Sequence, residues 1–239
     1  MGRVTIPALQ EMKRQGRKIV GVVAWDTPMA QLAERAGVDF VSVGDSVGKN
    51  LWGHATESEV TLDEMLVVCK AVRRGAQRAL VSCDAPAAAE PVSAGRRLAD
   101  EGGADMIKVH AAAAVVRELT RAGVAVFAEF HGGRPVAELV DEAKRLEDAG
   151  AAMLDFRHSG PEAGAAVVKA VSIPVIGGLG GGPWLDGRVR MAHAAIGYGI
   201  NWLDSDAETY AHVASIALAA LAAYAEDVRS GRQIKGQRG

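Results

Sequence analysis

The sequence alternates between short apolar runs and longer Ala-rich amphipathic segments along most of its length. The runs are rich in Val and Ile, and helical segments of about ten to fifteen residues separate them, which is typical of repeated βα units and a parallel sheet. Seven clear runs and a weaker last one cover Ile19–Ala24, Phe40–Val43, Ala79–Cys83, Met106–Val109, Val124–Phe130, Ala151–Phe156, Pro174–Gly178 and Ile200–Leu203. Such a series fits a (β/α)8 barrel (TIM barrel) best, and a doubly wound open sheet is the alternative.

Amphipathic helical segments precede and separate these runs. Ala-Gly and Gly-Ala pairs recur just before the strands, and glycine suits the left-handed cap that ends a helix. The predicted helices are Ile6–Gly16, Pro28–Ala36, Leu62–Arg74, Val92–Glu101, Val136–Ala149 and Gly164–Ala170. No linker, low-complexity tract or block of charge divides the chain, so residues 1–239 are predicted to form a single barrel domain.

The segment Asp206–Ser230 is predicted to be one extended C-terminal helix with an unusually apolar face. That face carries Val213, Ile216, Ala217, Leu221 and Tyr224. Such a face either closes the barrel or packs on another subunit, so a homo-oligomer is the expected assembly.

Charge and hydropathy exclude several classes of partner. The 27 basic and 29 acidic residues give a net charge of -2, which offers no electrostatic case for nucleic acid or anionic membranes. No window is apolar over the length needed to cross a bilayer, and the N-terminus has no signal-type stretch. Cys69 and Cys83 both fall in apolar surroundings, as expected for core residues in a reducing compartment. A cytoplasmic protein is therefore expected.

Ionisable groups follow six successive predicted strands. The groups are Trp25-Asp26, Asp45-Ser46, Asp84, Lys108-Val109-His110, Glu129-Phe130-His131 and Asp155-Phe156-Arg157-His158. Gly44-Asp45-Ser46 is also good turn chemistry, and strand ends often become polar as they leave the core. That explanation does not cover Lys108 and His110, which share one face of an otherwise apolar strand. Because barrels carry their chemistry at the carboxyl ends of the strands, we expect a functional site there.

These residue types can be assembled into one kind of chemistry. Asp45 and Asp84, on neighbouring strands, can converge on one hard divalent cation. A 2-oxo acid would chelate the same cation, which would then stabilise an enolate of that acid. Lys108 would hold the substrate carboxylate or the developing oxyanion, unless it snorkels at the barrel rim. Asp155 is the candidate base, unless a salt bridge to Arg157 occupies it.

The glycine-rich stretch Gly177–Gly182 does not support a nucleotide site. It lacks the dinucleotide-binding spacing, and Pro183-Trp184 follows where a helix should begin. In a barrel, this loop would either cradle an anion or let substrate approach the backbone.

Several motifs resemble the ketopantoate hydroxymethyltransferase (3-methyl-2-oxobutanoate hydroxymethyltransferase) family of the phosphoenolpyruvate mutase/isocitrate lyase superfamily. The motifs are VGDSVG (Val43–Gly48) with Gly53-His54, AVRRGA (Ala71–Ala76), Asp84, GADMIKV (Gly103–Val109), IPVIG (Ile173–Gly177) and YAEDVRSG (Tyr224–Gly231). The resemblance implies a (β/α)8 barrel that binds Mg2+ and a 2-oxo acid. It also implies methylenetetrahydrofolate as the hydroxymethyl donor and a ring-shaped decamer.

By that resemblance, Asp45 and Asp84 would be metal ligands, Ser46 would bind the substrate carboxylate, and Lys108 would bind the substrate oxygens. The chain departs from the family at other positions. His110 stands where the family has a metal-site Glu, which makes it a candidate ligand, softer than a carboxylate, that would admit Mn2+, Fe2+, Co2+ or Zn2+ alongside Mg2+.

Further departures concern the second half of the site. Glu129 replaces a family His, with His131 two residues on, and both are predicted to bind substrate. Asp155 replaces the catalytic Glu and is one methylene shorter. The family loop after the fifth strand is missing, because His131–Pro135 leads straight into a helix. His110, Glu129 and His131 together are a rival metal cluster.

The changes surround one site while the fold motifs remain, which favours an altered substrate over decay. The leading hypothesis is a metal-dependent aldol-type enzyme that makes or breaks a C–C bond beside a 2-oxo acid carbonyl. One alternative is a C–C lyase or decarboxylase of the same superfamily, with Arg134 or Arg157 binding a second carboxylate. Another is a non-catalytic paralogue that uses the barrel as a scaffold.

Overall fold

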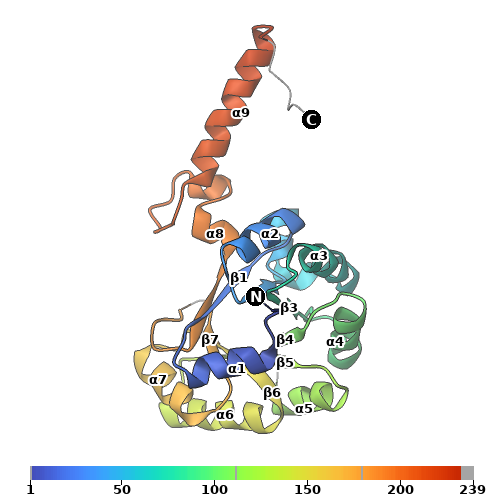
Figure 1. Ribbon diagram of the computed structural model, residues 1–239, viewed down its shortest axis with the longest axis vertical. Coiled ribbons are helices and arrows are strands. Elements are labelled where there is room, and N and C mark those ends of the chain that lie inside the picture. The colour runs from blue at the N-terminus through green and yellow to red at the C-terminus, as the bar shows by residue number, and fades with distance from the viewer. Residues whose placement is uncertain (1, 111, 179, 233–239) are drawn as a thin grey trace. The chain divides into compact units, whose positions relative to one another are not determined.

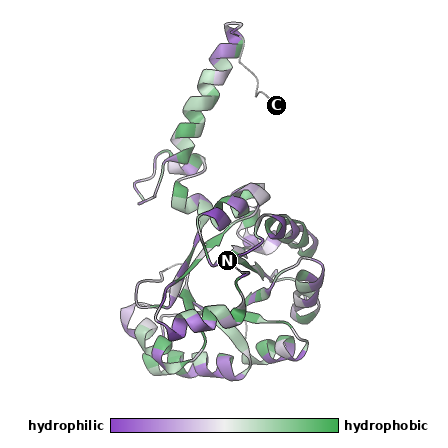
Figure 2. Ribbon diagram, viewed as in Figure 1, coloured by the Kyte–Doolittle hydropathy of each residue, from purple (hydrophilic) through white to green (hydrophobic). Residues whose placement is uncertain are grey.

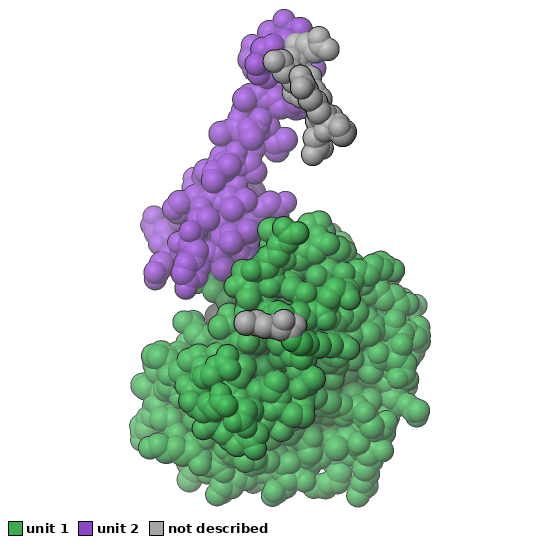
Figure 3. Space-filling model, in the orientation of Figure 1, with its two compact units in different colours: residues 1–190 green, residues 191–239 purple. Residues whose placement is uncertain are grey.

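The computed structural model describes residues 2–110, 112–178 and 180–232 (Figure 1). The chain divides into two compact units, residues 1–190 and 191–239, which Figure 3 colours separately. Eight parallel strands close into a barrel in sequence order, which excludes the open sheet. They are β1 (Ile19–Val23), β2 (Phe40–Val43), β3 (Leu80–Asp84), β4 (Met106–His110), β5 (Val126–His131), β6 (Ala151–Arg157), β7 (Val175–Gly177) and β8 (Gly187–Met191).

Helices alternate with the strands, as the Ala-rich segments predict. They are α1 (Ile6–Arg14), α2 (Thr27–Arg35), α3 (Leu62–Gly75), α4 (Pro91–Asp100), α5 (Ala113–Arg121), α6 (Val136–Asp148), α7 (Pro161–Ala170), α8 (Ala192–Ile196) and α9 (Val213–Arg229). Short π- or 3-10-helical turns are η1 (Gly48–Trp52), η2 (Glu57–Glu59) and η3 (Ile200–Trp202). Six of the predicted helices and seven of the predicted strands are confirmed, with ends displaced by at most two residues except at α7, which begins three residues earlier than predicted.

The prediction for the eighth strand is wrong. Ile200–Trp202 forms η3, and the eighth strand is Gly187–Met191 instead. In that strand Arg188 and Arg190 are exposed and alternate with the buried Gly187, so no continuous apolar run marks it. The backbone N–H of Ile19 donates to the carbonyl of Asp186 at 2.9 Å, where the chain enters β8.

The amino end of the barrel is sealed by apolar side chains. Leu9 and Met12 of α1 join residues from the starts of the strands in one buried cluster, because the amphipathic pattern of α1 places both on the same face. The strand members are Ile19, Phe40, Leu80, Met106, Phe127, Met153 and Ile176. Cys69 and Cys83 are buried free thiols, as predicted. The interior of the barrel at its amino end is therefore filled by packed side chains.

The C-terminal helix is shorter than predicted. It covers Val213–Arg229, whereas residues 206–212 are irregular, with bends at Ala207 and Tyr210. The backbone N–H of Tyr210 donates to Ala195 at 2.8 Å, and that of Ala214 donates to Gly197 at 2.9 Å, so these groups bond outside the helix. Eight strands close the barrel, so α9 is not needed to close it. Figure 2 shows α9 as predominantly apolar over much of its length.

Candidate active site

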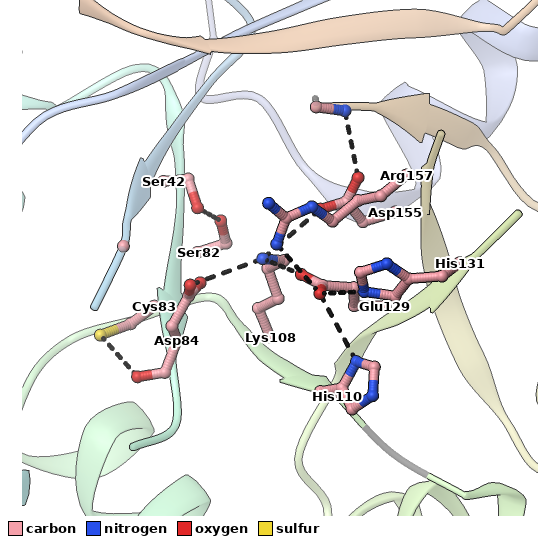
Figure 4. Close-up of polar contacts among 12 residues, drawn as sticks. Ser42, Ser82, Cys83, Asp84, Lys108, His110, Glu129, His131, Asp155 and Arg157 are labelled. Atoms are coloured by element: carbon pink, nitrogen blue, oxygen red, sulfur yellow. Dashed lines mark hydrogen bonds and ion pairs between the residues drawn. The ribbon is translucent and has the colours of Figure 1, made fainter. Parts of the chain in front are cut away.

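Charged side chains from four successive strands meet at the carboxyl end of the barrel (Figure 4). In the strand register Asp84 of β3 pairs with Lys108 of β4, and Glu129 of β5 pairs with Asp155 of β6. Paired positions on parallel neighbours share a face of the sheet, so these side chains converge. The sequence prediction that these strand ends lie together is therefore correct.

Lys108 is the centre of this group. Its Nζ lies 2.5 Å from Glu129 Oε2, 3.4 Å from Asp155 Oδ2 and 3.5 Å from Asp84 Oδ2. Burial alone would lower the pKa of Lys108, but the three carboxylates outweigh it and raise that pKa above its ordinary value. Lys108 is therefore a permanent cation inside the barrel mouth rather than a snorkelling surface lysine.

Asp84 has one oxygen without a partner. Its Oδ2 faces Lys108, whereas Oδ1 is buried and accepts no hydrogen bond from the described residues. Burial raises the pKa of Asp84 to about 7, against a smaller lowering by Lys108. Burial, and then the charge of Glu57, also raises the pKa of Asp45. Two carboxylates that line one cavity, one of them with a buried oxygen that accepts no hydrogen bond from the described residues, are a ligand set that suits a hard divalent cation.

Asp45 and Ser46 lie in the turn after β2 and not in the strand itself. A Cβ added at Gly44 would stand 2.9 Å from Ser46 Oγ and 3.8 Å from Asp84 Oδ2. Glycine at this position therefore lets the Ser46 hydroxyl and the Asp84 carboxylate approach the same point. The turn at Asp45-Ser46 is therefore confirmed, and the functional interpretation of these residues stays a prediction.

Glu129 joins Lys108 to a histidine pair. Its Oε1 lies 3.0 Å from His131 Nε2, 3.2 Å from Arg157 Nη1 and 3.5 Å from His110 Nδ1. Burial would raise the pKa of Glu129, but Lys108, Arg157 and His131 outweigh it and lower that pKa to about 2. Glu129 is therefore ionised at neutral pH.

Asp155 is 2% exposed and is held at both oxygens. Its Oδ1 accepts a hydrogen bond from the backbone N–H of Gly178 at 3.1 Å, while Oδ2 faces Lys108. Burial raises its pKa, and the charge of Lys108 opposes that rise. Arg157 forms a salt bridge with Glu129. The alternative salt bridge, between Arg157 and Asp155, is not found among the described residues. In the glycine-rich loop, Leu179 lies outside the described residues.

A cavity of about 370 Å3 opens over these groups. Its lining is Asp45, Glu57, Asp84, Ala85, Pro86, Ala87, Ala89, Pro91, Lys108, Val109, His110, Ala112, Val115, Glu129 and Arg157. Among the predicted site residues, Ser46, His131 and Asp155 are not part of this lining, and Asp155 contacts it through Lys108. Sequence reasoning missed Glu57, which comes from η2, because a polar loop residue carries no signal of its own.

A family model described as ketopantoate hydroxymethyltransferase matches residues 3–136 and 132–233. The chain belongs to this family. The 3-methyl-2-oxobutanoate hydroxymethyltransferase of Geobacillus kaustophilus (strain HTA426) is 37% identical over 244 residues, which cover 91% of this chain and 87% of that protein.

Two solved structures share the fold of this family member. A 2,3-dimethylmalate lyase, titled a PEP mutase/isocitrate lyase superfamily member, matches 100% of this chain and 91% of its own with a TM-score of 0.65 and 15% identity. A phosphonopyruvate hydrolase complex with oxalate and Mg2+ matches 95% of this chain and 87% of its own with a TM-score of 0.65 and 17% identity.

Among the described residues, no helix has the length and hydropathy needed to cross a membrane.

Proposed function

We propose that this ketopantoate hydroxymethyltransferase family member is a metal-dependent enzyme that makes or breaks a C–C bond beside the carbonyl of a 2-oxo acid, through an enolate. The observation that carries the proposal is the buried Lys108 ammonium, surrounded by three carboxylates next to the unpartnered Oδ1 of Asp84. The names of the curated relatives support hydroxymethyl transfer, with methylenetetrahydrofolate as the proposed co-substrate.

Asp45 and Asp84 are the proposed ligands of the divalent cation, with Mg2+ or Mn2+ as the first choices. Both line the same cavity, and burial raises the pKa of each carboxyl group against the opposing charge of Lys108. When bound, the cation would supply Lewis-acid polarisation of the substrate carbonyl. The sequence also predicted His110 as a ligand of this cation, but its Nδ1 lies 3.5 Å from Glu129 Oε1, so we do not include it in this ligand set.

Lys108 and Ser46 are proposed to bind the substrate oxygens. The ammonium of Lys108 stays protonated, so it can donate hydrogen bonds to a carboxylate or to the oxygen where negative charge develops. The Ser46 hydroxyl, next to Gly44, would donate to the substrate carboxylate. Glu129 would line the substrate site and fix the position of Lys108, whereas His131, which is not part of the cavity lining, would act through its contact with Glu129.

Asp155 is the proposed general base. Its carboxylate would accept the proton from the carbon beside the carbonyl, and the electron pair of that C–H bond would move toward the carbonyl oxygen. The raised pKa makes Asp155 a stronger base than an exposed aspartate, and the N–H of Gly178 fixes its orientation. Because Asp155 lies 3.4 Å from Lys108, a substrate oxygen bound by Lys108 would bring the adjacent carbon near this base.

The test is deuterium exchange at the carbon beside the carbonyl, followed by NMR in D2O with Mg2+ or Mn2+. A panel of 2-oxo acids, 3-methyl-2-oxobutanoate among them, is incubated with the full chain. We expect exchange with at least one acid, loss of that exchange in Asp155→Asn, and unchanged exchange in the control His212→Ala, at an exposed position outside the cavity. Absence of exchange with every acid would refute the proposal, and absence of divalent-cation binding by calorimetry would favour the non-catalytic paralogue.

One observation favours a C–C lyase or decarboxylase as the second candidate. Arg157 lines the cavity, where its guanidinium could bind the second carboxylate of a diacid, whereas Arg134 pairs with Glu142. Release of CO2 or glyoxylate from a panel of 2-oxo and hydroxy diacids, abolished by Arg157→Gln, would select this reaction over hydroxymethyl transfer.

A further inference from the structure

A histidine pair and a carboxylate lie together beside the proposed catalytic centre. His110 ends β4, and Glu129 and His131 stand two residues apart at the end of β5, on the same side of that strand. The register pairs His110 of β4 with Glu129 of β5, so the pairing of these two strands brings the three side chains together. One potential ligand atom of each lies within 4.8 Å of those of the other two.

The two spacings that involve Glu129 match those of ligands around one metal ion, and the two imidazole nitrogens lie within 4.8 Å of each other. Atoms bound about 2.0–2.2 Å from a common ion, at angles of about 90–110°, lie about 3.0–3.5 Å apart. Glu129 Oε1 lies 3.0 Å from His131 Nε2 and 3.5 Å from His110 Nδ1. Figure 4 shows both imidazoles directed toward this oxygen.

The two oxygens of Glu129 have different partners. Oε2 contacts the ammonium of Lys108 at 2.5 Å, whereas Oε1 faces the two imidazoles and Arg157. The Arg157 side chain is 33% exposed, so it can turn toward solvent when another cation takes its place. Lys108 stands between Glu129 and Asp84, which separates this cluster from the Asp45–Asp84 pair.

We propose that His110, Glu129 and His131 form a second cation site, which takes a divalent transition metal such as Zn2+, Fe2+ or Co2+ in preference to Mg2+. Two imidazole nitrogens and one carboxylate oxygen are a ligand set that selects such metals, whereas Mg2+ prefers oxygen alone. His110 is 73% exposed and lines the cavity, so the ion reaches the site from solvent and keeps open positions for water or ligand. The site does not depend on the proposed function.

The experiment titrates the full chain with Co2+ in the presence of excess Mg2+ and follows visible absorption. We expect a Co2+ spectrum that Mg2+ does not remove. His131→Ala and Glu129→Gln should each weaken Co2+ binding by at least about 100-fold. Losing a residue that only supports a ligand costs up to about 100-fold in metal affinity, and losing a ligand itself should cost no less. His110→Ala should do the same, and circular dichroism verifies that each variant is folded.

Two control variants make the result specific. Asp84→Asn removes a proposed ligand of the other cation and should leave the Co2+ spectrum intact, as should His212→Ala, which removes an exposed imidazole elsewhere. An unchanged Co2+ spectrum in His131→Ala, or its loss in Asp84→Asn, would overturn the second site, as would absence of Co2+ binding. The exchange assay with Mg2+ tests Asp155 and can fail independently of this result.

Discussion

At the scale of single residues, the barrel mouth holds more negative than positive charge. Among the residues around the cavity, Asp45, Glu57, Asp84, Glu129 and Asp155 face the cations Lys108 and Arg157. The raised pKa values of Asp45, Asp84 and Asp155 are the direct consequence of burial without enough compensating charge. The site is therefore built to gain stability from an added cation.

Replacing Asp84 tests that balance. The ordinary pKa of Asp84 is 3.8, and its pKa in the folded protein is about 7. Between pH 3.8 and pH 7 the folded state therefore holds more protons than the unfolded state. Stability of the metal-free protein therefore falls as pH rises through that window. We expect Asp84→Asn to raise the free energy of unfolding by about 2 kcal/mol at pH 8, and by less at pH 5.

Thermal unfolding at the two pH values, with and without Mg2+, measures this effect. Mg2+ should raise the Tm of the natural protein but not that of Asp84→Asn, because the variant lacks the ligand. A variant that is less stable than the natural protein at pH 8 without metal would contradict the argument.

Glu129 should behave in the opposite way. Its pKa falls from 4.5 to about 2 on folding, so its ionised form contributes stability above pH 4.5 that is lost as pH falls toward 2. Glu129→Gln should cost about 2 kcal/mol at pH 7, because Lys108 and Arg157 lose a buried partner. Urea unfolding at pH 7 and pH 3 measures the difference, with Glu118→Gln on the exposed face of α5 as control. Equal stabilities of the two variants at pH 7 would rule out this role.

At the scale of secondary structure, barrel closure depends on a strand that has almost no apolar signature. A Cβ at Gly187 in β8 would stand 2.1 Å from the backbone oxygen of Ile19 in β1. A backbone atom cannot move aside as a side chain can. Glycine at this position is therefore required for β1 and β8 to approach each other.

Gly187→Ala should cost about 3 kcal/mol or more, because overpacking against backbone forces the strands apart. Gly178→Ala is the matched control, since a Cβ there would meet its nearest atom, Asp155 Oδ1, at an ordinary 3.5 Å. Urea unfolding of both variants provides the comparison. Similar midpoints for the two would show that β8 tolerates the extra methyl group.

At the scale of the whole molecule, the second unit carries a helix that buries none of its side chains. The apolar Ile216, Leu218 and Leu221 of α9 are 66%, 54% and 66% exposed. Covering such a face is favourable, which supports the homo-oligomer expected from the sequence.

Light scattering coupled to size exclusion tests the assembly. The natural protein should have a mass several times the 24.9 kDa of one chain, and the double variant Ile216→Glu with Leu221→Glu should shift to smaller species. Charged groups on that face would have to be buried at the interface, which is unfavourable. A natural protein that runs as a monomer would contradict the homo-oligomer.

Particular residues show how far the sequence could be interpreted. The strands β1 to β7 were predictable because buried parallel strands leave continuous Val- and Ile-rich runs. β8 was not, because Arg188 and Arg190 project from its exposed face. The convergence of Asp84, Lys108, Glu129 and Asp155 followed from their place at strand ends. Their individual contacts could not be predicted, because the carboxylate that a lysine contacts depends on distances of a few ångströms across the barrel.

The sequence by itself determined the fold class, the end of the barrel that carries the chemistry, and the residue types gathered there, since these depend on local periodicity and position along each strand. Only the tertiary structure decided that Arg157 pairs with Glu129 rather than Asp155, and that Glu57 lines the cavity. It also decided that Asp84 Oδ1 has no hydrogen-bond partner among the described residues. The physical reason is that burial and charge at one residue depend on every strand that packs around it, and no single segment contains that information.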